Sequence, residues 1–303
     1  MGMTKNQLAL VRYVAENDLQ KAKEAAICCC VEDNTQKNHC AVTKYQSLLH
    51  SGGMNMLELP ANVSGFATME DLSNTYLENR YYLTSEEKEL FELIKNMNDV
   101  SLQLMEKQIP YLNATLLYGE SGVGKTAFSK YVAYKLGLPY LYVNFSRMLD
   151  SYLGGTAKNL TNLFNFINQQ QCVVMLDEID SLAVKREYSG GGASAEVSRS
   201  TTCLLQLLDS VTNDHVIIAA TNLVEDVDSA VKRRFTEKHE LHRLSTEDNK
   251  RFIEQFLNDA GFGYDLHSVE EYAKQNHSQA EIMTHVTRCI ANMLIKKENI
   301  VVL

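Results

Sequence analysis

The sequence lacks two features that would place the protein in a membrane or on nucleic acid. It has no apolar run long enough to cross a bilayer as a helix, and its N-terminus has no signal-peptide pattern. It also lacks an excess of positive charge, since the formal net charge at pH 7 is −9. This balance argues against a protein whose whole surface grips nucleic acid, although a local basic channel is compatible with it.

The seven cysteines lack the C-x-x-C spacing that is common in zinc sites. Three of them, Cys28-Cys29-Cys30, are consecutive, which suits neither orderly disulfide pairing nor a four-ligand zinc site. His39-Cys40 lies nearby without a second pair to complete such a site. We therefore expect buried thiols in a reducing compartment, and hence a cytoplasmic protein.

The zinc-protease motif H-E-x-x-H is absent as well. The nearest stretch is His239-Glu240-Leu241-His242, which is followed by Arg243 where the second histidine of the motif would stand. What the chain does have is an ordinary globular composition, with 303 residues of which 45% are hydrophobic and 22% charged. That length allows one large domain with appendages, or two modest domains.

The N-terminal part reads as helical and is followed by a connector. In residues 1–50, Leu8, Val11 and Val14 share one face of a predicted helix, and a second stretch with the same helical periodicity of apolar residues follows. A third short helix is predicted over 41–49. This region is either a partner-docking module or a cap on the core, and the sequence does not decide between them. Residues 51–82 contain Ser51-Gly52-Gly53, Pro60 and Gly65, and we interpret them as a connector.

The central part, residues 83–244, alternates short apolar runs with amphipathic stretches. Runs such as VVML and VIIAA are continuously apolar, as expected for a parallel sheet covered on both faces. Strands are predicted at 114–118, 140–144, 172–176 and 216–220, with a fifth near 239–244, and helices at 85–107, 125–136, 157–169 and 196–209.

The last part, residues 245–303, contains helical patterns only, at 246–259, 267–275 and 278–296. The sequence therefore predicts an α/β fold: a parallel sheet flanked by helices, then a small all-helical lid subdomain, with a helical segment ahead of both.

A glycine-rich loop follows the first predicted strand. It reads Gly119-Glu120-Ser121-Gly122-Val123-Gly124-Lys125-Thr126, which matches the phosphate-loop pattern G-x-x-x-x-G-K-[ST]. The glycines let backbone N–H groups point at phosphate oxygens, and a helix N-terminus adds positive potential. Lys125 supplies a cation for the β- and γ-phosphates, and the Thr126 hydroxyl is placed to bind Mg²⁺. The competing interpretation is a glycine-rich turn that carries a lysine by chance. We expect residues 119 to 126, together with Ala127, to bind ATP.

Two acids end the strand predicted at 172–176. Asp177 can hold Mg²⁺ or its water shell, and Glu178 can polarise an attacking water. The alternative is a solvated acidic turn.

Polar and basic residues follow the strand predicted at 216–220. Asn222 would lie beside the γ-phosphate if this strand neighbours the one that leads to the phosphate loop; otherwise it is a helix cap or turn residue. Arg233 and Arg234 are either solvated charge or residues that reach into a neighbouring subunit's site.

In this order the motifs resemble those of the AAA ATPases. YGESGVGKT, VVMLDEID, AATN and KRRF are similar to the Walker A, Walker B, sensor 1 and arginine-finger segments of that family, and the adjacent arginine pair is similar to the katanin and spastin type. Tyr152, Leu153 and Gly154 resemble its first pore loop, and the segment 278–282 resembles its sensor 2 segment, with an alanine in place of arginine.

Two departures from the family pattern are evident. Glu120 and Ser121 stand where the phosphate loop of the family usually has prolines, which should alter loop stiffness more than phosphate contact. The N-terminal region matches no adaptor domain. Because H-E-x-x-H is absent, any proteolysis linked to such an ATPase would reside in another chain.

The resemblance implies an ATPase that needs ATP and Mg²⁺ and forms a homo-oligomeric ring, a hexamer in our expectation. Such a ring would remodel, unfold or disassemble a protein substrate through a central pore, with a substrate or adaptor held by the pore and the N-terminal helices. One alternative is a nucleic-acid-associated ATPase of the same superfamily, such as a loader, initiator or transposition helper. A second is a nucleotide-sensing scaffold without turnover, against which the retained Lys125, Asp177, Glu178, Asn222 and Arg234 count.

Overall fold

The computed structural model describes residues 3–15, 19–32, 42, 59–149, 155–169, 171–183, 192–211 and 215–303. The chain divides into two compact units, one of residues 1–58 with 73–75 and one of residues 59–72 with 76–303. The predicted pore-loop residues Tyr152, Leu153 and Gly154 lie outside the described residues, and so does nearly all of the helix predicted at 41–49.

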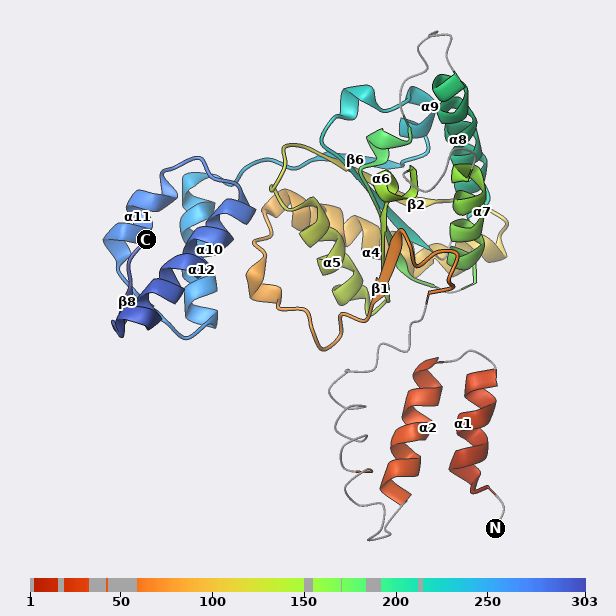
Figure 1. The fold of residues 1–303 in the computed structure, drawn as a ribbon, viewed down its shortest axis with the longest axis horizontal. Helices are drawn as coiled ribbons and strands as arrows, with labels where there is room; N and C mark the ends of the chain where they lie inside the picture. Colours follow the sequence, from red (N-terminus) through yellow and green to blue (C-terminus); the bar gives the residue numbers. More distant parts are fainter. Residues whose placement is uncertain are drawn as a thin grey trace. The chain divides into compact units, whose positions relative to one another are not determined.

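The first unit contains a helical hairpin. Helix α1 (Lys5–Ala15) packs against α2 (Leu19–Glu32), and the Asn6 side chain donates a hydrogen bond to Glu32 Oε1 at 2.6 Å (Figure 1). Of the apolar face predicted in α1, Leu8 is 56% exposed, Val11 52% and Val14 53%. Two helices bury too little surface to cover that face within the described part of this unit.

The expectation of buried thiols is wrong for much of the chain. Cys28 is exposed, Cys29 and Cys30 are half-buried, and Cys172 alone among the described cysteines is fully buried. The reason is local: Ala22 and Ala25 mark the buried side of α2, and consecutive helical residues point about 100° apart, so three cysteines in a row cannot all face that side. All six cysteines in the described ranges are free thiols.

A six-stranded sheet organises the second unit (Figure 1). Its strands are β1 (Ala67–Glu70), β2 (Asn113–Tyr118), β3 (Tyr140–Asn144), β4 (Val173–Asp177), β5 (Val216–Thr221) and β6 (Glu237–Glu240). Their spatial order is β1-β3-β4-β5-β2-β6, and all neighbours are parallel except β1, which runs antiparallel to β3. The predicted parallel α/β sheet is confirmed.

Helices cover both faces of this sheet. On one side lie α4 (Ser85–Glu106) and α5 (Lys125–Leu136), and on the other α7 (Thr156–Ile167) and α8 (Gly192–Leu208) (Figure 1). Between them the central strands β2, β4 and β5 are almost entirely buried, which explains their unbroken apolar sequences. The shorter elements are η1 (Glu78–Arg80), α6 (Phe145–Leu149), η2 (Ile179–Ser181), η3 (Val224–Asp226) and α9 (Ser229–Lys232).

The structure differs from the predicted strands at the two edges of the sheet. Strand β1 lies within the predicted connector, and β6 spans 237–240 rather than 239–244. Both are four residues long, β1 is only half buried, and β6 has the sequence EKHE with no fully buried residue. An edge strand can be short and charged because half of its surface faces solvent, so it carries little apolar signal.

The C-terminal region packs α10 (Thr246–Asp259), α11 (Leu266–Ala273) and α12 (Gln279–Lys296) around a core of their own that includes Phe252, Ile253, Ile282 and Val286. It is not purely helical as predicted, because β7 (Gly263–Tyr264) and β8 (Ile300–Val301) form a two-residue parallel ladder. Among the helices described here, none has both the length and the apolar character needed to cross a membrane.

Candidate functional site

A cavity of about 380 Å³ opens where β2, β4 and β5 end. The carboxyl ends of parallel strands are the usual ligand-binding edge of such sheets. Its lining combines the predicted phosphate loop, the predicted acids and the start of α12: Arg80, Tyr81, Ser121, Gly122, Gly124, Lys125, Thr126, Ala127, Asp177, Glu178, Asn222, Gln279, Ala280 and Met283. Sequence segments that are far apart therefore meet in one cavity.

The phosphate loop joins β2 to α5 through a backbone that requires glycine. Gly122 and Gly124 have φ values of +81° and +116°, in the region that side chains rarely adopt. A Cβ at Gly124 would lie 2.7 Å from Cε2 of the Tyr81 ring, and one at Gly122 would lie 2.8 Å from Ser278 Oγ. The loop is therefore held closely between the segment before α4 and the first turn of α12.

Lys125 is the first residue of α5, and its ammonium lies against the loop. It donates to the carbonyls of Gly119 and Glu120, both at 2.8 Å, and to Asn222 Oδ1 at 2.7 Å. Burial lowers the pKa of Lys125, while the nearby carboxylates of Asp177 and Asp180 act in the opposite direction. The ammonium is thus a charge partly withdrawn from water, which strengthens its attraction to an anion.

The hydrogen bond to Asn222 depends on strand order. Residues 113–118 of β2 pair in register with residues 216–221 of β5, so the two strand ends lie side by side. The condition set for Asn222 from the sequence is therefore met. Next to it, the Thr221 hydroxyl donates to Asp180 Oδ1 at 2.5 Å, which ties the end of β5 to the turn after β4.

The two acids occupy the tip of β4. Asp177 is its last residue: Oδ1 accepts the Glu178 N–H at 3.0 Å, and Oδ2 accepts the Tyr142 hydroxyl at 2.8 Å. Glu178 has φ 56° and ψ 45°, a left-handed conformation that is uncommon for a residue with a side chain. Strain of this kind is often stored at functional sites. The turn separates the two carboxylates, although both line the cavity.

The groups that could hold Mg²⁺ are Thr126 and Asp177. Both line the cavity, one at the start of α5 and the other at the end of β4. The described residues contain no group of three or more His, Cys, Asp or Glu that could hold a metal ion. A hydroxyl and a carboxylate are oxygen donors that suit Mg²⁺, which usually takes one or two protein ligands together with substrate phosphates and waters.

The predicted arginine pair lies away from this cavity, at the end of the short helix α9. Arg234 forms a two-pronged ion pair with Asp209, in which Nε and Nη2 each donate at 2.9 Å. That hydrogen bond raises the pKa of Arg234 and lowers the pKa of Asp209. Arg233 is exposed, and neither arginine lines the cavity of its own chain.

Sequence reasoning missed several residues that shape the cavity. Gln279 lies in the segment noted as sensor 2-like, and its amide pairs with both backbone groups of Tyr82: Oε1 accepts the N–H at 3.3 Å and Nε2 donates to the carbonyl at 3.2 Å. The Ala280 N–H donates to the Gly122 carbonyl at 3.2 Å. Tyr81 and Arg80 carried no sequence signal, because they precede α4 by a few residues and reach the site only through folding.

Comparison with known proteins fits this geometry. Residues 115–243 match the family model described as "ATPase family associated with various cellular activities (AAA)". An uncharacterised AAA family ATPase of Sinorhizobium fredii is 35% identical over 182 residues, which are 60% of this chain and 54% of that protein. The ATP-dependent zinc metalloprotease FtsH 2 of Phytoplasma mali is 30% identical over 216 residues, 68% of this chain and 31% of that one.

A proteasome-activating nucleotidase of Methanococcus maripaludis is 36% identical over 121 residues, which are 39% of this chain and 30% of that protein. The chain thus spans about half, or less, of the length of the curated relatives it matches.

Proposed function

Because this chain carries an AAA domain and through it belongs to the AAA family of ATPases, we propose that it binds ATP with Mg²⁺ and hydrolyses it within a ring of identical subunits. The observation that carries the proposal is the convergence of Lys125, Asp177, Glu178 and Asn222 on one cavity from three neighbouring strand ends. A solvated acidic turn and a chance glycine-rich turn would have no reason to meet there.

Each of these residues has a separate task in the proposal. The loop N–H groups and Lys125 bind the β- and γ-phosphates, while Thr126 and Asp177 hold Mg²⁺, which when bound neutralises phosphate charge. Glu178 polarises the attacking water from the other side of the turn, and Asn222 lies beside Lys125 at the γ-phosphate end. Electrostatic stabilisation and positioning are the main requirements of phosphoryl transfer.

The ring follows from the place of the arginines. Since Arg233 and Arg234 lie outside their own cavity, the charge that develops on the γ-phosphate would be neutralised by a neighbour's arginine. A head-to-tail contact of this kind forms a closed ring when the rotation between subunits closes. We expect six subunits. In the isolated subunit, Nε and Nη2 of Arg234 are paired with Asp209, so binding a neighbour's phosphate through these atoms would require Arg234 to leave that ion pair.

A protein is the proposed substrate of this ATPase. The names of several relatives associate them with the proteasome or with a protease, which supports a role in protein remodelling. DNA-stimulated ATP hydrolysis would instead favour the nucleic-acid-associated alternative.

Mixing two inactive variants tests the shared site. Arg234→Ala subunits should bind ATP and hydrolyse it about 10³- to 10⁵-fold more slowly, and Lys125→Ala subunits should not hydrolyse it. A mixture should regain activity, because some interfaces then pair an intact Lys125 site with an intact arginine. The ratio is varied, since a ring that needs turnover at every interface would mask rescue at some ratios.

The matched control mixes Lys125→Ala with the double variant Lys125→Ala/Arg234→Ala, which creates no intact interface and should stay inactive. If every ratio of the first mixture is inactive and analytical ultracentrifugation with ATP shows only monomers, the shared-site proposal is wrong.

A further inference from the structure

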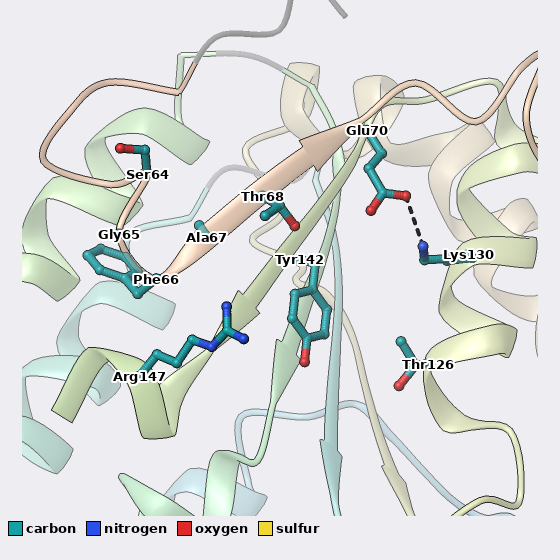
Figure 2. A pocket seen from close by; sticks show the side chains of 10 residues that line it. All are labelled: Ser64, Gly65, Phe66, Ala67, Thr68, Glu70, Thr126, Lys130, Tyr142 and Arg147. Atoms are coloured by element: carbon teal, nitrogen blue, oxygen red, sulfur yellow. Dashed lines mark hydrogen bonds and ion pairs between the residues drawn. The ribbon is translucent and has the colours of Figure 1, made fainter. Parts of the chain in front are cut away.

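A second cavity, of about 330 Å³, lies beside the nucleotide cavity. It is lined by the segment that leads into β1, by β1, β3 and α6, and by one side of α5, and its lining includes Thr126, Tyr142 and Arg147 (Figure 2). Thr126 lines both cavities. The wall between the two cavities therefore contains Thr126, one of the two candidate Mg²⁺ ligands. Tyr142 contacts the other candidate ligand, Asp177.

Strand register brings Tyr142 to Asp177. Tyr142 of β3 pairs with Met175 of β4, and Asp177 follows Met175 by two residues, on the same face of the sheet. A tyrosine is long enough to reach a residue diagonally across two strands, and its hydroxyl donates to Asp177 Oδ2 at 2.8 Å. In Figure 2 the Tyr142 ring stands between Arg147 and Thr126.

The hydrogen bonds of Asp177 fix how its carboxylate is turned. Oδ1 accepts from the backbone of Glu178, and Oδ2 accepts from Tyr142. Each carboxylate oxygen can accept more than one hydrogen bond or ligand, so both retain capacity for a metal or its waters. With a donor on each oxygen, the carboxylate cannot rotate freely away from the cavity.

We propose that Tyr142 is a positioning residue that orients Asp177 for Mg²⁺ by donating a hydrogen bond to it from the side of the second cavity. This inference rests on the proposed function, since it assumes that Asp177 serves Mg²⁺ bound with a nucleotide. Groups that hydrogen-bond a metal ligand tune the metal strongly, and their loss commonly costs about 10- to 100-fold in metal affinity or activity.

The experiment measures Mg²⁺ binding rather than turnover. In the Glu178→Gln background, a fluorescent ATP analogue is bound at a series of Mg²⁺ concentrations, and the apparent Mg²⁺ affinity is compared with and without Tyr142→Phe. The Phe variant should weaken the apparent Mg²⁺ affinity about 10- to 100-fold. Its affinity for the analogue in EDTA should be unchanged, because no loop contact is lost.

The chain offers a matched control on the same strand. Tyr140 lies two residues earlier and is fully buried, and its hydroxyl pairs with Ser129 Oγ at 2.9 Å. Tyr140→Phe makes the same chemical change without touching Asp177. Because Ser129 Oγ donates to the Thr126 carbonyl at 2.8 Å and does not need Tyr140 for that bond, the variant should leave Mg²⁺ affinity unchanged. Because the Tyr140 hydroxyl is the more buried, this variant should lose at least as much thermal stability as Tyr142→Phe.

A Tyr142→Phe protein that binds Mg²⁺ as tightly as its parent would overturn the proposal, and so would equal weakening in both Phe variants. If the Glu178→Gln parent binds the analogue with no dependence on Mg²⁺, the proposed function itself fails. Weakening confined to Tyr142→Phe supports the positioning role.

Discussion

Lys125 and Glu178 lie in the same cavity but on different elements, and the proposed mechanism gives them tasks that can be separated. Lys125 donates three charge-assisted hydrogen bonds, to two loop carbonyls and to Asn222. Glu178 lines the cavity from the turn after β4, and within the described part of the chain its hydrogen bonds are to Asp177 and Ser181, on its own side of the cavity.

We predict that Lys125→Ala loses ATP binding whereas Glu178→Gln keeps it. A charged hydrogen bond contributes about 1.5–3 kcal/mol, so the lysine variant should bind ATP roughly 10- to 100-fold more weakly or worse. The glutamine variant should hydrolyse ATP about 10²- to 10⁴-fold more slowly at unchanged affinity. Equilibrium binding and steady-state hydrolysis measure the two effects, and normal turnover by Glu178→Gln would remove Glu178 from the mechanism.

Two glycines with positive φ allow a second test at this scale. Gly124 has φ +116°, and a Cβ there would press on the Tyr81 ring, which is buried and hydrogen-bonded to Glu87. Gly137, after α5, has φ +65°, and a Cβ there would meet nothing within 4 Å. An alanine would be strained at both positions, more so at Gly124, whose φ lies beyond the left-handed region of other residues, and only at Gly124 would it also collide with a neighbour.

We predict that Gly137→Ala lowers the free energy of unfolding by about 1–2 kcal/mol and binds ATP normally. Gly124→Ala should lose a further 1–3 kcal/mol or so through overpacking, together with most of its ATP affinity, because the loop must shift away from Tyr81. Thermal or chemical unfolding and nucleotide titration of both variants provide the measurement. Equal ATP affinity in the two would show that the loop tolerates the displacement.

At the scale of elements, the start of α12 closes the nucleotide cavity. Ser278 caps this helix, accepting the Glu281 N–H, while the Glu281 carboxylate accepts the Ser278 N–H, a capping box. The same turn carries Gln279 and Ala280 to the cavity. Arg243 adds a bridge, since it donates to Glu120 Oε2 at 2.7 Å and to the Asn276 carbonyl, which links the phosphate loop to the segment before α12.

The capping box leads to a prediction about ATP affinity. Ser278→Ala should cost about 1 kcal/mol of stability and also weaken ATP binding, because the loosened turn presents Gln279 and Ala280 less well. Asp265 caps α11 in the same subdomain by accepting the Ser268 N–H, away from the cavity. Asp265→Ala should therefore cost a similar amount of stability and leave ATP affinity unchanged. Parallel loss of affinity in both would mean that general lid stability, not this turn, controls binding.

For the whole molecule, the division into two units decides what can be removed. Residues 59–72 belong with the second unit because β1 pairs with β3, whereas the hairpin of α1 and α2 belongs to the first. The second unit has its own apolar clusters around α4, α5 and the sheet and around α10 to α12. Among the described residues that line the nucleotide cavity, Arg80 is the first in the chain.

We therefore predict that a chain starting at residue 59 folds and binds ATP with an affinity within about twofold of the full chain, a difference below roughly 0.5 kcal/mol. In the presence of ATP and Mg²⁺, the truncated chain should unfold at the same melting temperature as the second unit does within the full chain. The reason is that ligand binding stabilises the unit that holds the site, and both proteins contain that unit. A truncated chain that does not fold, while one starting at residue 51 does, would place part of the core before residue 59.

Features that depend on local chemistry can be read from the amino-acid sequence. Phosphate loops need glycine, lysine and threonine at fixed spacing, and buried parallel strands need unbroken apolar runs, so the loop at 119–126, the two acids at the tip of β4 and the four inner strands could all be predicted. Helices with capping residues and one apolar face, such as α4 and α12, were equally accessible from the pattern.

Contacts between residues that are distant in the sequence could not be predicted, because they depend on how the strands are ordered and aligned in the folded sheet. The order of the strands allows the hydrogen bond between Lys125 and Asn222, and their register allows the one between Tyr142 and Asp177. Neither pair has a sequence spacing that would indicate a contact. The folded sheet also contains the edge strands β1, with the sequence ATME, and β6, with the sequence EKHE. Because these strands lie at the edges of the sheet, their sequences contain too few apolar residues for a strand to be predicted. Long-range pairing is set by the summed packing of whole elements, and no single stretch of the chain encodes it.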